Sequence, residues 1–372
     1  MDSRESDILA VLKAWCRVEP VSAPAALRLD QDDWERLATT AGREGVAGLI
    51  CRALTDDPAA ALVPERVRIE LQQIAREQAA AHAWQEATLG EVLDAFGRSG
   101  LSPVLLRGHA LVASLYESDG SLRPQLDHDL LVPHREMPEA RKVLRRLGFE
   151  DGEEAGDVFS RDDVTVDLHH DPYDRSRVPS RGRVIRADAA GVHRRAIEAR
   201  VAGRPVLQPC PSDRVILLST HLVKHSFDRL IRMVDIAECW RQSSPDPEVV
   251  EDRARREGTA DAVYYALAAA RVRLDAPAPG NLMARLEPPR RRWVDRAFGE
   301  VLRGRSPGAY FAERLLLSQL GSWRERLTAV GEMLWTPEHH TRAASESIAR
   351  RFVAAPERVV DVARRALTRH GS

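Results

Sequence analysis

Cysteine is scarce in this chain, and lysine is scarcer still. The 372 residues include four cysteines, and no two of them form a C-x-x-C pair. This spacing excludes a disulfide scaffold or a cysteine-based zinc module and is typical of reduced core residues in a cytosolic protein. Three lysines stand among 55 basic residues, and this arginine bias, with abundant alanine, is typical of a GC-rich bacterial genome rather than of a function. The cysteines are Cys16, Cys51, Cys210 and Cys239, and the lysines are Lys13, Lys142 and Lys224.

A surplus of charge of either sign is also missing. The formal net charge is −1, which argues against broad electrostatic attachment to nucleic acid and leaves room only for a local basic face. The chain has no charged leader followed by an apolar stretch and no run of ~18 apolar residues, so we expect a cytoplasmic protein that neither is secreted nor spans a membrane. Hydrophobic residues make up 44% of the chain, enough for a large core in two or three domains.

The most informative segment that is present is Arg-Pro-Gln-Leu-Asp-His-Asp-Leu-Leu-Val-Pro, residues 123–133. Its central part is short, mostly apolar and bounded by prolines, which predicts a β-strand over 126–132. Side chains two apart share a strand face, so Asp127 and Asp129 project together while His128 points the other way. Two carboxylates side by side on an apolar strand repel each other unless a cation lies between them, and such hard oxygen ligands suit Mg²⁺ or Mn²⁺. A bare D-x-D is more often a pair of solvated acids, so this interpretation depends on the neighbouring segments.

Two neighbouring segments supply that context. Residues 102–116 have the pattern of a strand, a tight Arg-Gly turn and a helix, and the unpaired N–H groups at a helix start suit an anion. Residues 164–170 alternate cleanly between apolar and polar side chains, which predicts a second strand. Asp167 and His169 share its more polar face, so this strand brings a third carboxylate.

From about Val104 to Asp171 the chain resembles the polymerase-β-like nucleotidyltransferases, specifically the branch of uncharacterised nucleotidyltransferases. With a later H-x-x-x-H helix, the resemblance spans roughly residues 90–240. Arg107 stands where the branch commonly has lysine, and the Gly-Ser turn of the wider superfamily is absent, so phosphate contacts at this turn are less well supported than the metal site. The matching elements are Leu105-Leu106-Arg107-Gly108, Arg123 to Val132, Leu147-Gly148-Phe149, Val166-Asp167-Leu168-His169, and His221-Leu222-Val223-Lys224-His225.

The resemblance implies a fold and a chemistry. The expected fold is α+β, a mixed nucleotidyltransferase-fold sheet flanked by helical regions. Asp127 and Asp129 would hold Mg²⁺ or Mn²⁺ on a nucleoside triphosphate such as ATP, and Asp167 would complete a second metal site and act as the base or orient the acceptor hydroxyl. Two such ions ~3.5–4 Å apart clamp the attacking and leaving oxygens, and the products are a nucleotidylated acceptor and pyrophosphate. The candidate nucleotide-binding residues are Arg107, Gly108, His109, Arg123, Lys224 and His225.

Several of these residues have a structural interpretation beside the functional one. Arg123 precedes the acid pair by four residues, and it either pairs with the carboxylates, which is slightly favoured, or touches the triphosphate. Arg107 is the better phosphate candidate because it stands on the turn. His109 follows the turn and either serves the site or simply begins the helix. His221 and His225 share one helical face, a spacing that suits zinc, but no third ligand is identifiable.

Coarse patterning divides the chain into three parts. A long amphipathic helix opens at Pro64 and a helix around 88–98 ends the first part, whereas Asp235 fits a polar contact among the later helices. The arginine-rich stretch 350–369 is interpreted as a solvated helix rather than a nucleic-acid grip. The expected parts are a helical region over 1–99, the nucleotidyltransferase core over 100–209, and a helical C-terminal domain over 210–372.

Other function classes remain open. His170-Asp171, with His221 and His225, suggests an HD-type metal phosphohydrolase, but that chemistry needs its His-Asp pair on a helix and here the pair ends a strand. A non-catalytic nucleotide-binding or regulatory protein on the same fold is a second alternative, and the three surviving carboxylates argue against it. A toxin-like transferase that modifies tRNA is a third, and the near-zero net charge favours a small-molecule or peptide acceptor. Base and acceptor pockets are built from scattered contacts, so the pattern does not specify which triphosphate, which acceptor or which oligomeric state.

Overall fold

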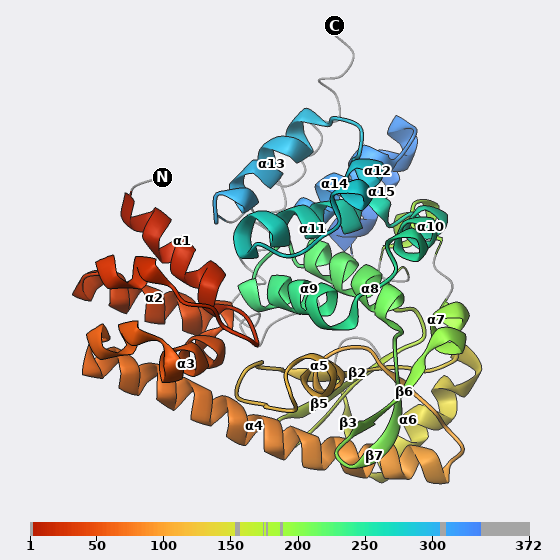
Figure 1. Cartoon of the computed structure of the whole chain (residues 1–372). Helices are drawn as coiled ribbons and strands as arrows, with labels where there is room; N and C mark the ends of the chain where they lie inside the picture. Colours follow the sequence, from red (N-terminus) through yellow and green to blue (C-terminus); the bar gives the residue numbers. More distant parts are fainter. Residues whose placement is uncertain are drawn as a thin grey trace, which may run out of the picture.

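The chain folds into a mixed β-sheet with helices before and after it in sequence, as expected for an α+β protein (Figure 1). The computed structural model describes residues 3–152, 157–173, 175, 178–186, 189–305 and 310–335. The arginine-rich stretch 350–369 lies outside the described residues. Across the described part of the chain, no helix combines the length and the apolar character needed to cross a membrane.

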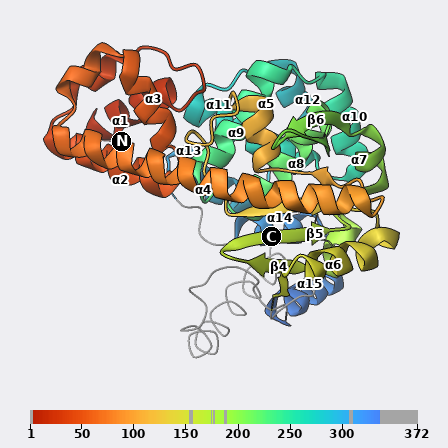
Figure 2. The ribbon, with the colours of Figure 1, turned by 90° about the horizontal axis from the view of Figure 1, so that it is seen from below.

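Four helices precede the sheet, and the last of them is unusually long. α4 runs unbroken for 34 residues, including the stretch 88–98 for which the pattern suggested a separate helix. Gly90 lowers the helix propensity there, but Leu89 and Phe96 are fully buried against the sheet, and this packing outweighs the propensity. Seen from below, α4 crosses the sheet region and carries the other N-terminal helices at its first end (Figure 2). The bounds are α1 (Ser3–Trp15), α2 (Gln31–Glu44), α3 (Ala47–Asp56) and α4 (Glu65–Arg98), with 3-10 turns at η1 (Pro24–Arg28) and η2 (Pro58–Leu62).

The sheet has seven strands in the order β3-β4-β5-β2-β1-β7-β6. Two neighbouring pairs, β2 with β5 and β1 with β7, are parallel, and the other pairs are antiparallel. The strands expected around 126–132 and 164–170 form the two central strands β2 and β5. The bounds are β1 (Val104–Leu105), β2 (Asp127–Leu131), β3 (Glu150–Asp151), β4 (Val158–Arg161), β5 (Val164–His169), β6 (Ile197–Val201) and β7 (Arg204–Gln208), with α5 (His109–Leu115), η3 (His134–Glu136), α6 (Met137–Arg146), η4 (Pro179–Arg183) and α7 (Ala189–Arg195) between them.

The two faces of the sheet have different environments. On one face, Leu130 of β2 and Val166 of β5 pack with α4 and α6 in a core that also contains Phe159. Because strand residues alternate, the acidic residues of β2 and β5 lie on the other face, which looks towards the C-terminal helices. The alternation of side chains thus gives the sheet one apolar face, which packs against α4 and α6, and one face that carries the acidic residues.

Eight helices follow the sheet and complete the described fold. Side chains from the N-terminal helices, such as Trp15 and Trp34, belong to the same buried cluster as side chains of α8, α9 and α11. The four cysteines are free thiols; Cys16 and Cys239 are buried, as expected for core residues, whereas Cys51 and Cys210 are half-buried. The bounds are α8 (Pro211–Lys224), α9 (Leu230–Ser243), α10 (Pro247–Glu257), α11 (Ala260–Leu274), α12 (Gly280–Leu286), α13 (Arg292–Leu302), α14 (Phe311–Gln319) and α15 (Trp323–Trp335).

Candidate active site

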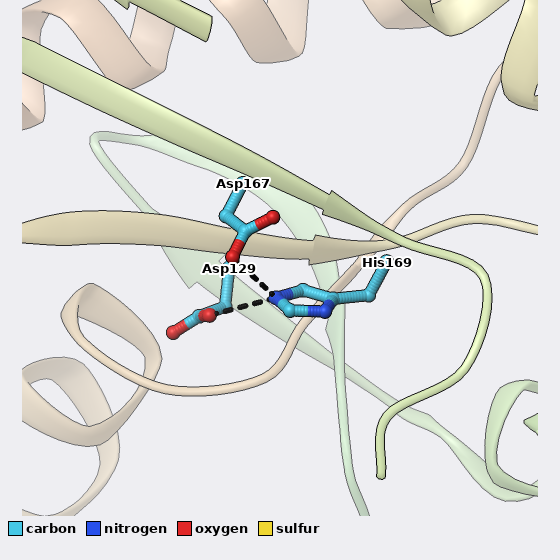
Figure 3. A group of neighbouring side chains, drawn as sticks. All are labelled: Asp129, Asp167 and His169. Carbon is cyan, nitrogen blue, oxygen red and sulfur yellow. Dashed lines mark hydrogen bonds and ion pairs between the residues drawn. The ribbon is translucent and has the colours of Figure 1, made fainter. Parts of the chain in front are cut away.

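The acidic residues of β2 and β5 meet because these two strands are parallel neighbours. The register places Asp129 directly opposite Asp167 and Asp127 opposite Thr165. Paired residues of adjacent strands point to the same face, so Asp129 and Asp167 project side by side (Figure 3). The convergence of acidic side chains from two neighbouring strands, expected from the sequence pattern, is therefore present in the fold.

His169, at the end of β5, closes the group formed by Asp129 and Asp167. Its Nε2 lies 2.9 Å from Asp129 Oδ1 and 3.3 Å from Asp167 Oδ2. One donor atom from each of the three side chains lies within 4.8 Å of the others, and Figure 3 shows them pointing toward one another. The alternation of β5 already put His169 on the face of Asp167, but the residue was not assigned to the site. Its i+2 spacing from Asp167 was the signal that could have found it.

Arg107 lies on the Arg-Gly turn between β1 and α5. Its Nε donates to Asp129 Oδ2 at 2.8 Å and its Nη2 donates to Oδ1, so the ion pair is bidentate. Its Nη1 donates to His221 Nδ1 at 2.7 Å. Gly108 follows with φ of +61°, a backbone conformation that side chains rarely adopt, and a Cβ there would lie 2.9 Å from Gln125 Oε1. The glycine therefore permits the turn that aims Arg107 at the acids.

The acids of β2 differ in their electrostatic surroundings. Burial alone would raise the pKa of Asp129, but Arg107 and His169 together hold it well below its ordinary value. Asp127 is the exposed residue of β2 and lies outside the group of three. Part of its surface reaches solvent, yet desolvation by the surrounding protein and repulsion from Asp129 raise the pKa of Asp127 to about 6. Arg107 lowers the pKa of both acids, but at Asp127 it does not offset the effects of desolvation and of Asp129.

Arg123 does not lie among these carboxylates. Its Nε and Nη2 donate to the two oxygens of Asp235 on α9, each at 2.8 Å, and Tyr116 donates to the same carboxylate at 2.6 Å. Arg123 and Asp235 are buried, and Asp235 raises the pKa of Arg123 although burial opposes the charge. The favoured expectation, that Arg123 pairs with the acids of β2, is wrong: its partner is Asp235, 112 positions away. The expected polar contact of Asp235 among the helices is present.

His109 lies on the side of β2 opposite the acids. Its ring stacks on His82 of α4 at 4.3 Å and lies 5.0 Å from the ring of His128, and Gln125 donates to it. Desolvation is the main reason why the pKa of His109 falls to about 2 and that of His128 to about 4, so both rings are neutral. His109 therefore begins α5 as a buried packing residue, and its place among the nucleotide-binding candidates is not supported by its position.

A cavity that is partly open to solvent lies beside Arg107, the partner of Asp129, and His221 forms another part of its wall. Lys224 of α8 and Arg181 of η4 add cationic side chains, while α11 and α14 contribute apolar ones such as Leu315. His225 packs against His221 with their ring centroids 4.4 Å apart. Among the described residues, the group close enough to share an ion does not include His221 or His225, and His221 instead accepts a hydrogen bond from Arg107.

Comparison with known proteins agrees with this geometry. The family model described as "Uncharacterised nucleotidyltransferase" matches residues 30–275, more than half of the chain. The chain belongs to this nucleotidyltransferase family. No curated protein and no solved structure matches it. The family match confirms the resemblance seen in the sequence, and it extends that resemblance upstream and downstream, from α2 to the residue after α11.

Nucleotidyltransferases generally depend on divalent cations, and the possible ligand atoms of Asp129, Asp167 and His169 suit such a cation. Asp129 and Asp167 offer carboxylate oxygens and His169 offers a ring nitrogen, all held on rigid strands. The alternative of an HD-type phosphohydrolase finds no matching geometry: β5 ends at His169, and His170-Asp171 follow in a bend rather than a helix. Asp171 instead accepts hydrogen bonds from the backbone N–H groups of Tyr173 and Arg175, as a local cap does.

Proposed function

We propose that this protein transfers a nucleoside monophosphate group from a nucleoside triphosphate to an acceptor hydroxyl and releases pyrophosphate. The observation that carries the proposal is the pairing of Asp129 with Asp167 across parallel strands, with Asp127 on the same face. Phosphoryl-type transfer asks mainly for positioning and for charge stabilisation, which a converging set of carboxylates with bound cations supplies.

Asp127, Asp129 and Asp167 are the residues that would hold Mg²⁺ or Mn²⁺. Such ions, when bound, neutralise charge on the triphosphate and on the attacking and leaving oxygens. The raised pKa of Asp127, about 6, and the cationic partners of Asp129 both reflect a site whose carboxylates need positive charge around them. The donor chemistry therefore supports divalent metal dependence.

Each side chain has a distinct task in the proposed reaction. Arg107 and Lys224, which line the same cavity, bind the triphosphate, and His221 holds Arg107 from the cavity wall. Asp167 accepts the proton of the acceptor hydroxyl. The hydroxyl oxygen then forms a bond to the α-phosphorus, the bond from that phosphorus to the α–β bridging oxygen breaks, and pyrophosphate leaves with the bond electrons.

The acceptor is proposed to be a small molecule or a peptide. A net charge of −1 gives no general attraction for a polyanion, so a tRNA acceptor is the less favoured alternative. This charge balance favours a compact acceptor over an extended nucleic acid.

The test is to incubate the purified protein with each labelled triphosphate and a cell extract and to follow the label. Transfer is expected to require a divalent cation and to fall by about 10²–10³-fold or more in Asp127→Asn and Asp129→Asn. Asp162→Asn, at the exposed β4–β5 turn, is the matched control and should transfer normally. Undiminished transfer in both site variants would defeat the proposal. Nucleotide binding without transfer would favour the regulatory alternative, and label released by water alone would favour a hydrolase.

A further inference from the structure

His169, to which the family resemblance gives no role, contacts both paired carboxylates. Its Nε2 is 2.9 Å from Asp129 Oδ1 and 3.3 Å from Asp167 Oδ2. Two ligand atoms at right angles around an octahedral cation, each about 2.1–2.2 Å from it, lie about 3 Å apart. The separations around His169 have the size expected of neighbouring ligands on one ion.

The ring of His169 is also fixed in position, as the side chain of a metal ligand must be. Its side chain is 6% exposed, and it stands two residues after Asp167 on the same rigid strand. The neighbouring histidine, His170, is half-buried beyond the strand end and lies with its ring centroid 5.1 Å from that of His134. His169 is therefore directed into the acids, whereas His170 packs against another ring.

We infer that His169 is a nitrogen ligand of the metal site, which makes the site selective for a first-row transition-metal ion such as Mn²⁺ over Mg²⁺. The inference rests on the proposed function only in taking this group to be a metal site. Mg²⁺ accepts oxygen donors almost exclusively and keeps much of its water, whereas Mn²⁺ and the later divalent ions accept imidazole nitrogen as well as carboxylate oxygen. A donor set that adds one imidazole to carboxylates favours the second class of ion.

Arg107 is compatible with this ligand set. A carboxylate has about four lone-pair sites, so Asp129 can accept hydrogen bonds from Arg107 and still present one oxygen to an ion. Arg107 also has a second anchor on His221, which keeps it beside the site if its contact with Oδ1 loosens. To hold an ion, His169 would present an unprotonated Nε2 and carry its proton on Nδ1.

The experiment measures Mn²⁺ binding to the full chain by electron paramagnetic resonance, with Mg²⁺ as the competitor. The wild-type protein is expected to bind Mn²⁺ at least about 10-fold more tightly than Mg²⁺, and the spin echo of bound Mn²⁺ should carry modulation from a directly bound nitrogen. In His169→Gln the nitrogen modulation should vanish and Mn²⁺ affinity should fall about 10-fold or more, while Mg²⁺ affinity changes much less.

Two further variants keep the inference testable whether or not His169→Gln folds. His169→Asp restores an oxygen donor and is expected to bind both ions without the Mn²⁺ preference. His170→Gln, the matched control, should retain the affinity and the nitrogen modulation of the wild type. Absence of nitrogen modulation in the wild type, no Mn²⁺ binding, or an unchanged preference in His169→Asp would overturn the inference.

This measurement is separate from the transfer assay. Nitrogen-coupled Mn²⁺ without transfer from any triphosphate would leave the metal assignment standing and remove the proposed function. Metal-dependent transfer together with Mn²⁺ that shows no nitrogen coupling would keep the function and remove the role of His169.

Discussion

At the scale of single residues, the guanidinium of Arg107 contacts a carboxylate on one side and an imidazole on the other. Its side chain is 13% exposed and that of Asp129 is 5% exposed, so the pair is largely shielded from water. His221 is half-buried, and desolvation together with Arg107 lowers its pKa well below the ordinary value, which keeps it a neutral acceptor. Arg107 thus supplies part of the positive charge that the acids of β2 and β5 need when no ion is bound.

Replacing Arg107 should make stability depend on metal. Arg107→Ala leaves Asp129 buried with much less compensation, which should lower the free energy of unfolding by about 3 kcal/mol in EDTA. Divalent cation should restore part of this loss because it takes over the neutralising charge. Urea unfolding in EDTA and in Mn²⁺ measures both values. Arg135→Ala, whose side chain is 85% exposed, should change stability by less than about 0.5 kcal/mol in either condition. Equal losses for Arg107→Ala with and without metal would contradict this account.

At the scale of elements, the segment that leads into β2 is tied to α9 by a buried ion pair. Arg123 and Asp235 are each less than 10% exposed, and Tyr116, just after α5, donates to the same carboxylate. The pair fixes the entrance of β2, and so the position of Asp127 and Asp129, against the C-terminal helices. An arginine near the acids therefore acts as an anchor between elements rather than as a phosphate ligand.

Breaking this ion pair should lower the free energy of unfolding, because the charge of Arg123 is then left buried without its partner. Asp235→Asn leaves Arg123 buried without a carboxylate and should lower the free energy of unfolding by about 3–5 kcal/mol. Tyr116→Phe removes one hydrogen bond and should cost about 1 kcal/mol. Asp228→Asn is the matched control, because its pair with Arg232 near the start of α9 is exposed and worth at most about 0.5 kcal/mol. Chemical denaturation ranks the three variants, and a loss in Asp235→Asn no larger than in the control would refute the anchor.

At the scale of the whole molecule, buried and half-buried neutral histidines set how the fold responds to acid. His82, His109, His128 and His221 all have a lowered pKa, with desolvation as the leading cause in each. In the unfolded chain these groups titrate near 6.5, so below that pH the unfolded state binds more protons than the folded state. Asp127, with its pKa raised to about 6, acts in the opposite direction but is a single group.

The free energy of unfolding is therefore expected to be highest above about pH 6.5 and to fall as the pH drops towards 4. His109 alone should contribute a loss of about 1.4 kcal/mol for each pH unit below 6.5, because its folded-state pKa lies near 2. Urea unfolding measured across this pH range gives the slope of the unfolding free energy against pH. His109→Gln should make this slope smaller by about 1.4 kcal/mol for each pH unit. A slope that is unchanged in His109→Gln, in a variant that folds, would show that His109 is not the neutral buried group described.

Local pattern was sufficient for some parts of the site. The two-residue repeat of a strand fixed Asp127 and Asp129 to one face and Asp167 and His169 to another strand's face, because side-chain alternation is a property of the extended backbone itself. The strand–turn–helix around Gly108 followed from residue types in the same way. These are short-range relations, and the fold contains them as expected.

The fold alone decided the rest, because the decisive contacts join residues far apart in the chain. Asp129 meets Asp167 only because β2 and β5 pair in parallel, with β3 and β4 inserted between them in sequence. The second partner of Arg107, His221, lies on α8, and the partner of Arg123, Asp235, lies on α9, each more than 100 positions away. An arginine near an acid pair has many possible partners, and packing of the C-terminal helices against the sheet selects among them by bringing one acceptor within hydrogen-bond distance.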